Sequence, residues 1–287
     1  MTVVWVDGAL IPEHERAISV LDHGLTVGDG AFETCTLVQG KVFALTRHLR
    51  RLEQSLRGIG LPDDVEPRVL EGVDAVLSQA GSLSGRLRIT VTAGAGTGAG
   101  QPGSARGSAR PTVIVTAAPA VMAAEGRAVR SPWVRNERSA VAGLKTISYI
   151  DNVVALADAR ARGGDEALLA NTVGELCEGT MSNVFVEVGG ELLTPPLSSG
   201  CLGGITRELV LEWGAEAGLP VREAAPGELP FTVLDDVTAG GGHLAVTSSG
   251  RNLQPVTWLD GVTLEPGPIS VSVRALFERL LVERLDP

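Results

Sequence analysis

The chain has 287 residues, of which 44% are hydrophobic and only 3% aromatic, and its formal net charge is −10 at pH 7. This length allows one large domain or two modest ones, with a core built mainly from aliphatic side chains. The acidic balance argues against a nucleic-acid partner held through phosphate contacts, but it does not argue against a small anionic ligand in a local basic pocket.

The cysteines and the N-terminal residues favour a cytoplasmic protein. Cys35, Cys177 and Cys201 have no CxxC spacing, so they predict reduced thiols, and neither a disulfide framework nor a metal site is expected. The first 20 residues have no basic start followed by an apolar core, so no signal peptide is expected. No apolar run approaches the roughly 18 residues that a membrane span needs, so no membrane partner is expected either.

The N-terminal part of the chain predicts a sheet with two helices. Alternating runs between Asp-Gly, Gln-Gly and similar turn signals predict strands at 2–6, 31–38, 41–45, 85–92 and 111–118. Leucines at helical spacing predict a helix over 46–58 with Thr46 as its N-cap, and a second helix is expected over 65–79. The run from Ala93 to Arg110, rich in glycine, alanine and serine, predicts a loop.

The C-terminal part predicts a second domain. A connector is expected at 118–125, between a small domain at 1–117 and a larger domain at 126–287. The larger domain is predicted to contain strands at 129–133, 166–171, 183–188, 191–194, 221–223 and 244–248, and helices at 152–162, 204–217 and 269–285. The fold class is therefore two-domain α+β, and we expect the second domain to form a pseudo-barrel.

The stretch from Gly143 to Phe185 carries the clearest chemical signal. Lys145 stands in a run without another charged residue from Ser139 to Ile150. A lysine that is partly desolvated has a lowered pKa, and its amine can then form a Schiff base with an aldehyde. A turn carrying Glu178 and Asn183 is predicted further on. From these residues alone, a surface lysine at a strand end stays an open interpretation.

Several short motifs occur in one order along the chain. They are Lys145-Thr146, Glu178-Gly179, Ser182-Asn183, Thr194-Pro195-Pro196 and Gly204-Ile205-Thr206-Arg207. Together they resemble the class IV aminotransferases, the fold-type IV group of pyridoxal-phosphate enzymes. This family holds branched-chain and D-amino-acid aminotransferases, (R)-amine transaminases and 4-amino-4-deoxychorismate lyases. The resemblance runs from about Trp5 to Val256, and it implies pyridoxal 5'-phosphate as cofactor.

The resemblance also implies roles for residues near the cofactor ring. Lys145 would form the Schiff base and then act as general base and acid. Glu178 would face the pyridine nitrogen, with Ser182 and Asn183 as further cofactor contacts. Tyr149, the only tyrosine, stands four residues after the lysine and would face the ring, although a core position is an equal alternative.

Other residues are implied as phosphate contacts. His48-x-x-Arg51-Leu52 resembles a motif whose arginine binds the cofactor phosphate, and a guanidinium fork suits that group. Gly204, Ile205 and Thr206 precede a predicted helix, whose N-terminus attracts anions. Ser248 and Ser249 resemble a second cluster on the phosphate side of the cofactor.

Substrate contacts follow from two further matches and one departure. GDGAFET at 28–34 resembles a strand that borders the substrate pocket, which implies Phe32 as a contact. Arg251 is the candidate for a substrate carboxylate, with a surface arginine as the alternative. D-amino-acid aminotransferases carry an arginine where this chain has Ala93, so their usual carboxylate anchor is missing.

The resemblance favours a transaminase that exchanges an amino group between a D-amino acid or (R)-amine and a 2-keto acid. The lysine-to-helix spacing supports that side of the family. The alternatives are 4-amino-4-deoxychorismate lyase and branched-chain L-amino-acid aminotransferase, and the shared fold cannot choose among them. The family also implies a homodimer in which a loop of one subunit closes the pocket of the other.

Overall fold

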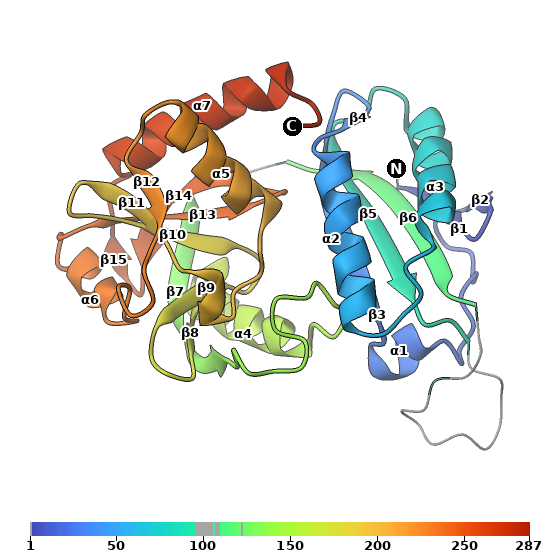
Figure 1. Ribbon diagram of the computed structural model, residues 1–287, viewed down its shortest axis with the longest axis horizontal. Helices are drawn as coiled ribbons and strands as arrows, with labels where there is room; N and C mark the ends of the chain where they lie inside the picture. Colours follow the sequence, from blue (N-terminus) through green and yellow to red (C-terminus); the bar gives the residue numbers. More distant parts are fainter. Residues whose placement is uncertain (1, 96–105, 107–109, 122) are drawn as a thin grey trace. The chain divides into compact units, whose positions relative to one another are not determined.

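Two compact units make up the protein (Figure 1), and a computed structural model describes residues 2–95, 106, 110–121 and 123–287. The first unit comprises Met1–Val121, Leu144–Tyr149 and Arg284–Pro287, and the second comprises Met122–Gly143 and Ile150–Glu283. The chain changes unit within the predicted connector. The segments 144–149 and 284–287 join the first unit, however, although the predicted boundaries assign both to the second domain. Most of the predicted loop at 93–110 lies outside the described residues.

The first unit contains a six-stranded antiparallel sheet. Its strands are β1 (Val3–Val6), β2 (Ala9–Ile11), β3 (Gly30–Val38), β4 (Lys41–Val42), β5 (Gly85–Thr92) and β6 (Thr112–Pro119). They follow the order β2-β1-β6-β5-β3-β4. The long ladder between β3 and β5 places Phe32 opposite Thr90 and Thr34 opposite Arg88, so these four side chains share one face of the sheet.

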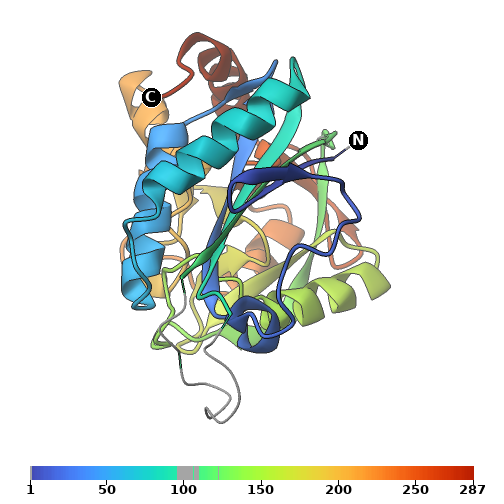
Figure 2. The same ribbon diagram turned by 90° about the vertical axis from the view of Figure 1, so that its right-hand side faces the viewer.

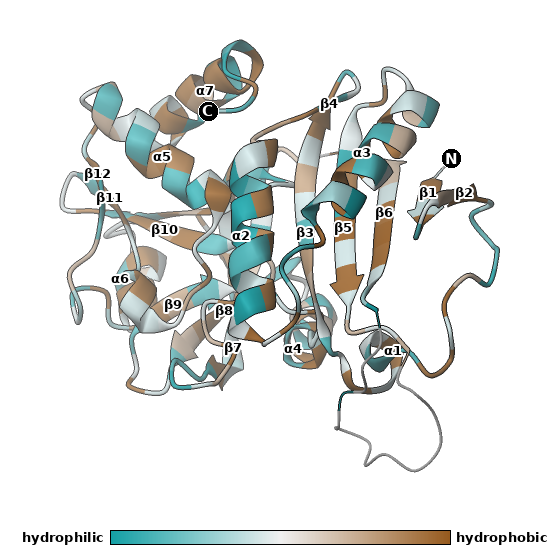
Figure 3. Cartoon of the chain, turned by 45° about the vertical axis from the view of Figure 1, so that its right-hand side comes forward, coloured by the Kyte–Doolittle hydropathy of each residue, from teal (hydrophilic) through white to brown (hydrophobic). Residues whose placement is uncertain are grey.

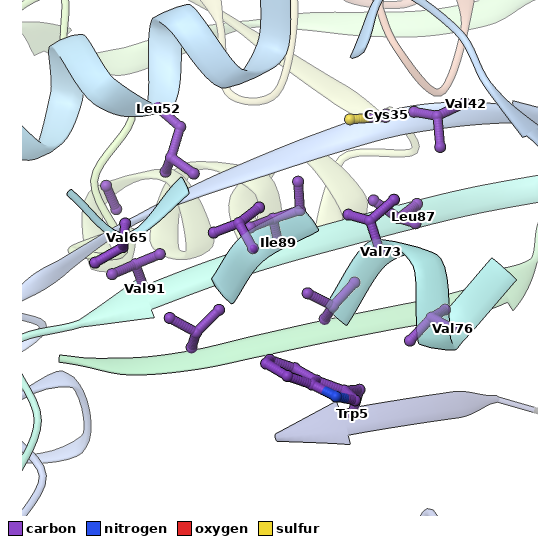
Figure 4. Packing of buried hydrophobic residues seen from close by; sticks show 14 of the residues in the cluster. Trp5, Cys35, Val42, Leu52, Val65, Val73, Val76, Leu87, Ile89 and Val91 are labelled. Carbon is purple, nitrogen blue, oxygen red and sulfur yellow. The ribbon is translucent and has the colours of Figure 1, made fainter. Parts of the chain in front are cut away.

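The opposite face of this sheet is covered by α2 (Leu45–Gly58) and α3 (Glu66–Ala80) (Figure 2). Side chains alternate along a strand, so every second residue of β3, β5 and β6 enters the core. Figure 4 shows Trp5, Leu52, Val73, Leu87 and Ile89 packed together in this core. Hydrophilic residues follow the visible side of α2 in Figure 3, as the amphipathic pattern predicts. A short helix, α1 (His23–Val27), precedes β3.

The last residues of the chain cap α2. Ala44 precedes this helix with a φ of 55°, and no side-chain hydrogen bond is made from that position. The carboxylate of Asp286 instead accepts hydrogen bonds from Thr46 N at 3.0 Å and from Thr46 Oγ1 at 2.5 Å. The carbonyl of Leu285 accepts from Ala44 N at 2.8 Å. The prediction of Thr46 as the N-cap was therefore wrong, because the cap comes from the other end of the chain.

The second unit contains a larger mixed sheet. Its strands are β7 (Gly126–Arg135), β8 (Glu166–Asn171), β9 (Leu176–Gly179), β10 (Asn183–Val188), β11 (Glu191–Thr194), β12 (Val221–Glu223), β13 (His243–Ser248), β14 (Asn252–Leu259) and β15 (Val262–Thr263). Their order is β12-β11-β10-β13-β14-β7-β8-β9, with β15 beside β14. The pairs β11–β12, β14–β7 and β7–β8 are parallel, and the other pairs are antiparallel.

Helices pack against this second sheet. They are α4 (Ile150–Ala161), α5 (Ile205–Glu216), α6 (Val233–Thr238) and α7 (Pro268–Glu283), with a 3-10 turn at Leu197–Ser199. The core is aliphatic, and Leu168, Val184 and Leu234 are fully buried in it. Trp213 of α5 packs on Phe277 of α7 with 5.0 Å between the ring centroids. In the described part of the chain, no helix combines the length and apolarity that crossing a bilayer requires.

One strand that matters for the site differs from the prediction. Glu178 lies in β9 and pairs with Leu169 of β8, whereas the sequence indicated a turn at this position. A four-residue strand is too short to show a hydrophobic period, and its glycine has a low β propensity. The longer strands at 85–92, 166–171 and 183–188 have the predicted bounds.

Candidate active site

Lys145 lies in a segment that extends the edge of the first sheet. The N–H of Phe32 donates to Lys145 O at 3.0 Å, and the N–H of Ile147 donates to Gly30 O at 3.0 Å. Lys145 N donates in turn to Ser55 Oγ of α2 at 3.1 Å. Both backbone polar groups of Lys145 are thus bonded within the first unit, which fixes the origin of its half-buried side chain.

Aromatic and basic side chains of the first unit surround the lysine amine. Lys145 Nζ lies 4.4 Å from the ring centroid of Phe32 and 5.9 Å from that of Tyr149. The two rings meet edge to face with 5.1 Å between centroids. Arg88 Cζ lies 3.9 Å from the centroid of Phe32, a distance typical of a cation–π contact. The structure therefore brings Phe32 and Tyr149 to the lysine, and it adds Arg88.

Arg51 is bound by a buried carboxylate. Its Nε and Nη2 donate to Glu33 Oε1 and Oε2, both at 2.7 Å. His48 stands three residues earlier on the same face of α2, and its Nδ1 lies 2.7 Å from Glu33 Oε2. The side chains of Glu33 and His48 are 0% and 1% exposed. The predicted phosphate contact thus belongs to a three-residue cluster.

The protonation states in this cluster follow from burial and charge. Burial by itself raises the pKa of Glu33, but the Arg51 guanidinium and the hydrogen bonds from Arg51 and His48 outweigh it and hold that pKa well below its usual value. Burial lowers the pKa of His48, despite the hydrogen bond to Glu33. The imidazole is therefore neutral near pH 7, and its Nδ1 carries the proton that the carboxylate accepts.

The GDG triplet at 28–30 shapes the start of β3. A Cβ on Gly30 would stand 2.4 Å from a backbone carbonyl of β5, so only glycine permits this approach. Asp29 accepts from Arg106 Nε at 2.7 Å and from Nη2 at 2.6 Å. Ala93, where D-amino-acid relatives are expected to carry an arginine, is buried. Arg106 belongs to the loop that follows, and it pairs with Asp29.

In the second unit, Glu178 is held by two donors. Arg135 Nε donates to Oε1 and Leu202 N to Oε2, both at 2.9 Å. Arg135 Nη2 donates to Asn152 Oδ1 at 3.3 Å, and Asn152 Nδ2 donates to the carbonyl of Thr180. These bonds fix the plane of a carboxylate that is only 11% exposed. A fixed carboxylate suits an acid that must face one ring atom.

Glu166 organises the turn after β9. Its carboxylate, 1% exposed, accepts from Thr180 N at 2.7 Å and from Ser182 Oγ at 2.8 Å, and it forms an ion pair with Arg251 Nη1 at 3.2 Å. Arg251 Nη2 also donates to Asp165 O at 3.1 Å. Ser182 and Arg251, predicted as cofactor and substrate contacts, thus both bond to one buried carboxylate. Their ligand roles stay predictions.

A helix N-terminus lies beside Asn183. Gly204 precedes α5, and among the described residues no side chain caps this helix, so the N–H groups of its first turn are suited to bind an anion. A Cβ on Gly204 would stand 1.9 Å from Asn183 Oδ1, so a larger residue here would displace the Asn183 side chain. Asn183 Nδ2 donates to Leu202 O at 2.7 Å. Ile205 and Thr206 are buried at this terminus.

Strand β13 ends next to the same asparagine. Thr247 pairs with Asn183, and its buried Oγ1 has no hydrogen-bond partner within the described ranges. The half-buried Ser248 and Ser249 follow directly. The second unit therefore gathers an uncapped helix N-terminus, an orphaned hydroxyl and two serines. A buried hydroxyl without a partner needs an explanation, and a bound anion would supply one.

Comparison with known proteins identifies the family to which these features belong. The sequence pattern of the family described as Amino-transferase class IV matches residues 30–258. The chain belongs to the class IV aminotransferase family. This result confirms the resemblance and the enzyme class expected from the sequence.

Relatives within the class IV family have several activities. The chain is 30% identical to a Methanocaldococcus jannaschii protein assigned as a branched-chain-amino-acid aminotransferase, over 96% of this chain and 94% of that one. It is 29% identical to the aminodeoxychorismate lyase of Bacillus subtilis (77% and 76% covered) and 27% identical to the D-alanine aminotransferase of Staphylococcus epidermidis (96% and 95% covered). A hypothetical aminotransferase from Mycobacterium tuberculosis, solved with α-ketoglutarate and PMP, superposes with a TM-score of 0.84 at 25% identity over 98% of this chain and 99% of that one.

The class IV fold and cofactor are those expected from the sequence. The small antiparallel sheet and the larger sheet, which curls into a half-barrel, form a fold-type IV enzyme, and class IV aminotransferases use pyridoxal phosphate. Each unit by itself carries groups whose chemistry suits this cofactor: the first has the half-buried amine of Lys145, and the second has the fixed carboxylate of Glu178 and a helix N-terminus near an orphaned hydroxyl. In the parts of the chain that are described, no three His, Cys, Asp or Glu side chains gather as metal ligands.

Four residues near the site were not singled out from the sequence: Glu33, Arg88, Arg135 and Glu166. Glu33 carried a signal, because it occupies the core-facing phase of β3 between Ala31 and Cys35, where a charged side chain needs a partner. Glu166 likewise opens a strand in which every residue is buried. Arg88 and Arg135 are less buried, and the sequence does not distinguish them from ordinary surface arginines.

Proposed function

We propose that this class IV enzyme moves an amino group between a D-amino acid or (R)-amine and a 2-keto acid by a ping-pong mechanism. The backbone bonds of Lys145 to β3 and α2 are the observation that carries the proposal. They fix the origin of a half-buried amine beside two aromatic rings. An amine fixed in this way suits a nucleophile that later transfers a proton.

Each candidate residue has a separate role toward the cofactor. The bound cofactor supplies an aldehyde that takes the amino group and a ring that withdraws electrons. Lys145 would bind the aldehyde of the cofactor, and its amine would move the proton at the donor Cα. Glu178 would keep the ring nitrogen of the cofactor protonated. Arg51 in the first unit, and the α5 N-terminus with Ser248 and Ser249 in the second, are each suited to bind its phosphate.

The chain offers a clean test of the lysine, because it contains only two lysines, Lys41 and Lys145. With pyridoxal phosphate, the wild type and Lys41→Ala should both develop a visible absorbance band, and Lys145→Ala should not. Borohydride reduction should fix the cofactor to Lys145 alone, as peptide mass spectrometry would show. A band that survives in Lys145→Ala would overturn the proposal.

The choice of donor rests on the lysine-to-helix spacing. Tyr149 stands four residues after Lys145, and α4 begins at Ile150, a spacing that matches the D-amino-acid, lyase and (R)-amine branches rather than the branched-chain branch. The 27% identity to a D-alanine aminotransferase is compatible with a D-amino acid as the donor. The 30% identical relative favours a branched-chain substrate instead, and the match of 28–34 and 248–256 to lyase motifs favours aminodeoxychorismate.

A half-reaction screen separates these donors. D-alanine, (R)-1-phenylethylamine, L-leucine and aminodeoxychorismate would be added in turn to the cofactor-loaded enzyme, and loss of the visible band would be followed. Bleaching by D-alanine or the (R)-amine is expected. Bleaching by L-leucine alone would contradict the proposed handedness, and release of 4-aminobenzoate with pyruvate would establish a lyase.

Arg88 is our candidate for the substrate carboxylate in place of the missing arginine at position 93. Its guanidinium and the amine of Lys145 both lie against the ring of Phe32. Arg88→Met should raise KM for amino and keto acids roughly 10- to 100-fold, because a hydrogen-bonded charge pair is lost. KM for (R)-1-phenylethylamine, which has no carboxylate, should stay nearly unchanged. If Arg251→Met and not Arg88→Met separates the two donor classes, Arg251 is the anchor.

We also propose that the enzyme is a cytoplasmic homodimer. Cys35, Cys177 and Cys201 are free and buried, which supports a reducing compartment. On α4, Ile150, Val153 and Val154 are exposed, and adjacent apolar side chains on one helix face suit an interface with a second copy.

A further inference from the structure

The buried carboxylate of Glu33 lies next to an arginine that is proposed to bind a phosphate, and its negative charge does not explain why it is there. Its carboxylate is fully buried and pairs side-on with Arg51, the arginine assigned to the cofactor phosphate. An anion at this position opposes the negative charge of a phosphate. If Arg51 served only as a positive charge, Glu33 would weaken the site.

We infer that Glu33, supported by His48, is a positioning residue that fixes the guanidinium plane of Arg51 for the cofactor phosphate. The inference rests on the proposed role of Arg51. Two parallel bonds, from Nε and Nη2 to the two carboxylate oxygens, determine both the place and the tilt of the planar fork. His48 Nδ1 bonds to Oε2, so the carboxylate itself cannot turn away.

The secondary structure makes this arrangement stiff. Glu33 pairs with Ile89 of β5, and Ala31 and Phe32 just before it bond to the segment that carries Lys145. His48 and Arg51 stand on α2, whose neighbouring residues Leu52 and Leu56 are buried in the core. An arginine ordered before the ligand arrives loses less rotamer entropy on binding, and that difference appears as affinity.

The test compares two ligands that differ only in the phosphate. Dissociation constants of pyridoxal phosphate and pyridoxal would be measured on the full-length apoprotein by absorbance titration, and their ratio would report the phosphate contact. The variants are Glu33→Asp, which keeps the charge but withdraws the carboxylate by one methylene, and Glu33→Gln, which removes the charge. Glu53→Gln on the exposed side of α2 is the matched control.

Positioning predicts that both Glu33 variants bind pyridoxal phosphate about tenfold or more weakly, while pyridoxal binding changes little, since one charged hydrogen-bond geometry is lost. Glu53→Gln should leave the ratio unchanged. If Glu33 acts only as a counter-charge, Glu33→Gln should instead strengthen the binding of pyridoxal phosphate, and Glu33→Asp should resemble the wild type. Either of these results would overturn the inference.

Two further measurements keep the inference testable. In an Arg51→Lys background, Glu33→Asp should have almost no additional effect on the ratio, because Glu33 acts through the arginine. If the Glu33 variants do not fold, as thermal melting would show, His48→Leu replaces them and should likewise weaken the binding of pyridoxal phosphate relative to that of pyridoxal. An unchanged ratio in His48→Leu would then count against the inference. A wild type that binds both ligands equally would refute the proposed role of Arg51 itself.

Discussion

At the scale of single residues, the buried carboxylate of Glu166 binds several donors in the second unit. It accepts from Thr180 and Ser182, and it pairs with Arg251. Glu166→Ala would leave these groups buried without their acceptor. We expect the free energy of unfolding to fall by about 3–5 kcal/mol, as for other broken buried ion pairs. Urea unfolding followed by circular dichroism would measure the change.

The control for this variant is Glu283→Gln. Glu283 and Arg279 form a pair on α7 in which both side chains are more than half exposed. Exposed pairs of this kind contribute at most about 0.5 kcal/mol on a helix. A loss for Glu166→Ala as small as that of Glu283→Gln would show that the turn after β9 does not depend on this carboxylate.

The cluster of Glu33, His48 and Arg51 predicts a pH dependence of stability. Burial lowers the pKa of His48, so below its ordinary value of 6.5 the unfolded chain takes up a proton that the folded chain does not. Stability should therefore fall as the pH drops below 6.5, by up to about 1.4 kcal/mol between pH 7.5 and 5.5. Comparing urea unfolding of the wild type and His48→Gln at both pH values isolates this contribution, and equal losses in the two proteins would refute it.

Glu33 adds a second step at lower pH. Its pKa is depressed in the folded protein, so its contribution is fully present above the ordinary value of 4.5 and is lost as the pH falls toward the folded value. The wild type should therefore lose more stability than Glu33→Gln between pH 5 and pH 3.5. The same unfolding titrations, extended downward, would measure this difference. If the stability of the wild type and of Glu33→Gln fell equally with pH, the ionised Glu33 carboxylate would not contribute to the stability.

At the scale of elements, the capping of α2 by Asp286 leads to a prediction about the helix. Asp286→Ala removes the acceptor for Thr46 N and should cost about 1 kcal/mol, while Asp286→Asn keeps an oxygen there and should cost less. Thermal unfolding of both variants measures the effect. In Thr46→Ala, Asp286→Ala should have a smaller effect, because the bond to the hydroxyl is already absent. Full additivity would contradict this arrangement.

The α2 helix also shows what sequence can and cannot predict. The spacing of its four leucines predicted the bounds of this helix to within one residue, because an apolar helix face depends only on residues that are close in sequence. Its cap comes from a residue 240 positions away, and no local pattern contains that information. Strand β9, which carries Glu178, was not predicted for a related reason. Its four residues form a strand because they pair with β8, and this pairing cannot be predicted from the four residues alone.

For the candidate site, the sequence indicated residue types whose roles stay predictions, and it did not indicate their structural partners. The order of the family motifs indicated Lys145, Arg51 and Glu178, because their chemistry demands particular residue types. The partners that hold these side chains, Glu33 and Arg135 among them, come from other elements, and pairing between elements depends on the three-dimensional fold.

At the scale of the whole molecule, the exposed face of α4 predicts assembly. Val153 is 57% exposed beside two other apolar residues of this helix. If a second copy covers this face, Val153→Glu should shift the protein from dimer to monomer in sedimentation velocity, since a buried unpaired charge is costly. Val282→Glu is the control, because Val282 is 70% exposed on α7. A dimer that persists in Val153→Glu would place the interface elsewhere.

The route of the chain through the first unit has a consequence for biosynthesis. Thr46 leaves the ribosome early, yet the carboxylate that caps its helix belongs to Asp286, and the segment carrying Lys145 also arrives late. At translation rates of about 5–20 residues per second, the nascent first unit waits roughly ten seconds or longer for its last partners. Its strands and helices are made first, but the unit is completed only after the whole second unit has been synthesised.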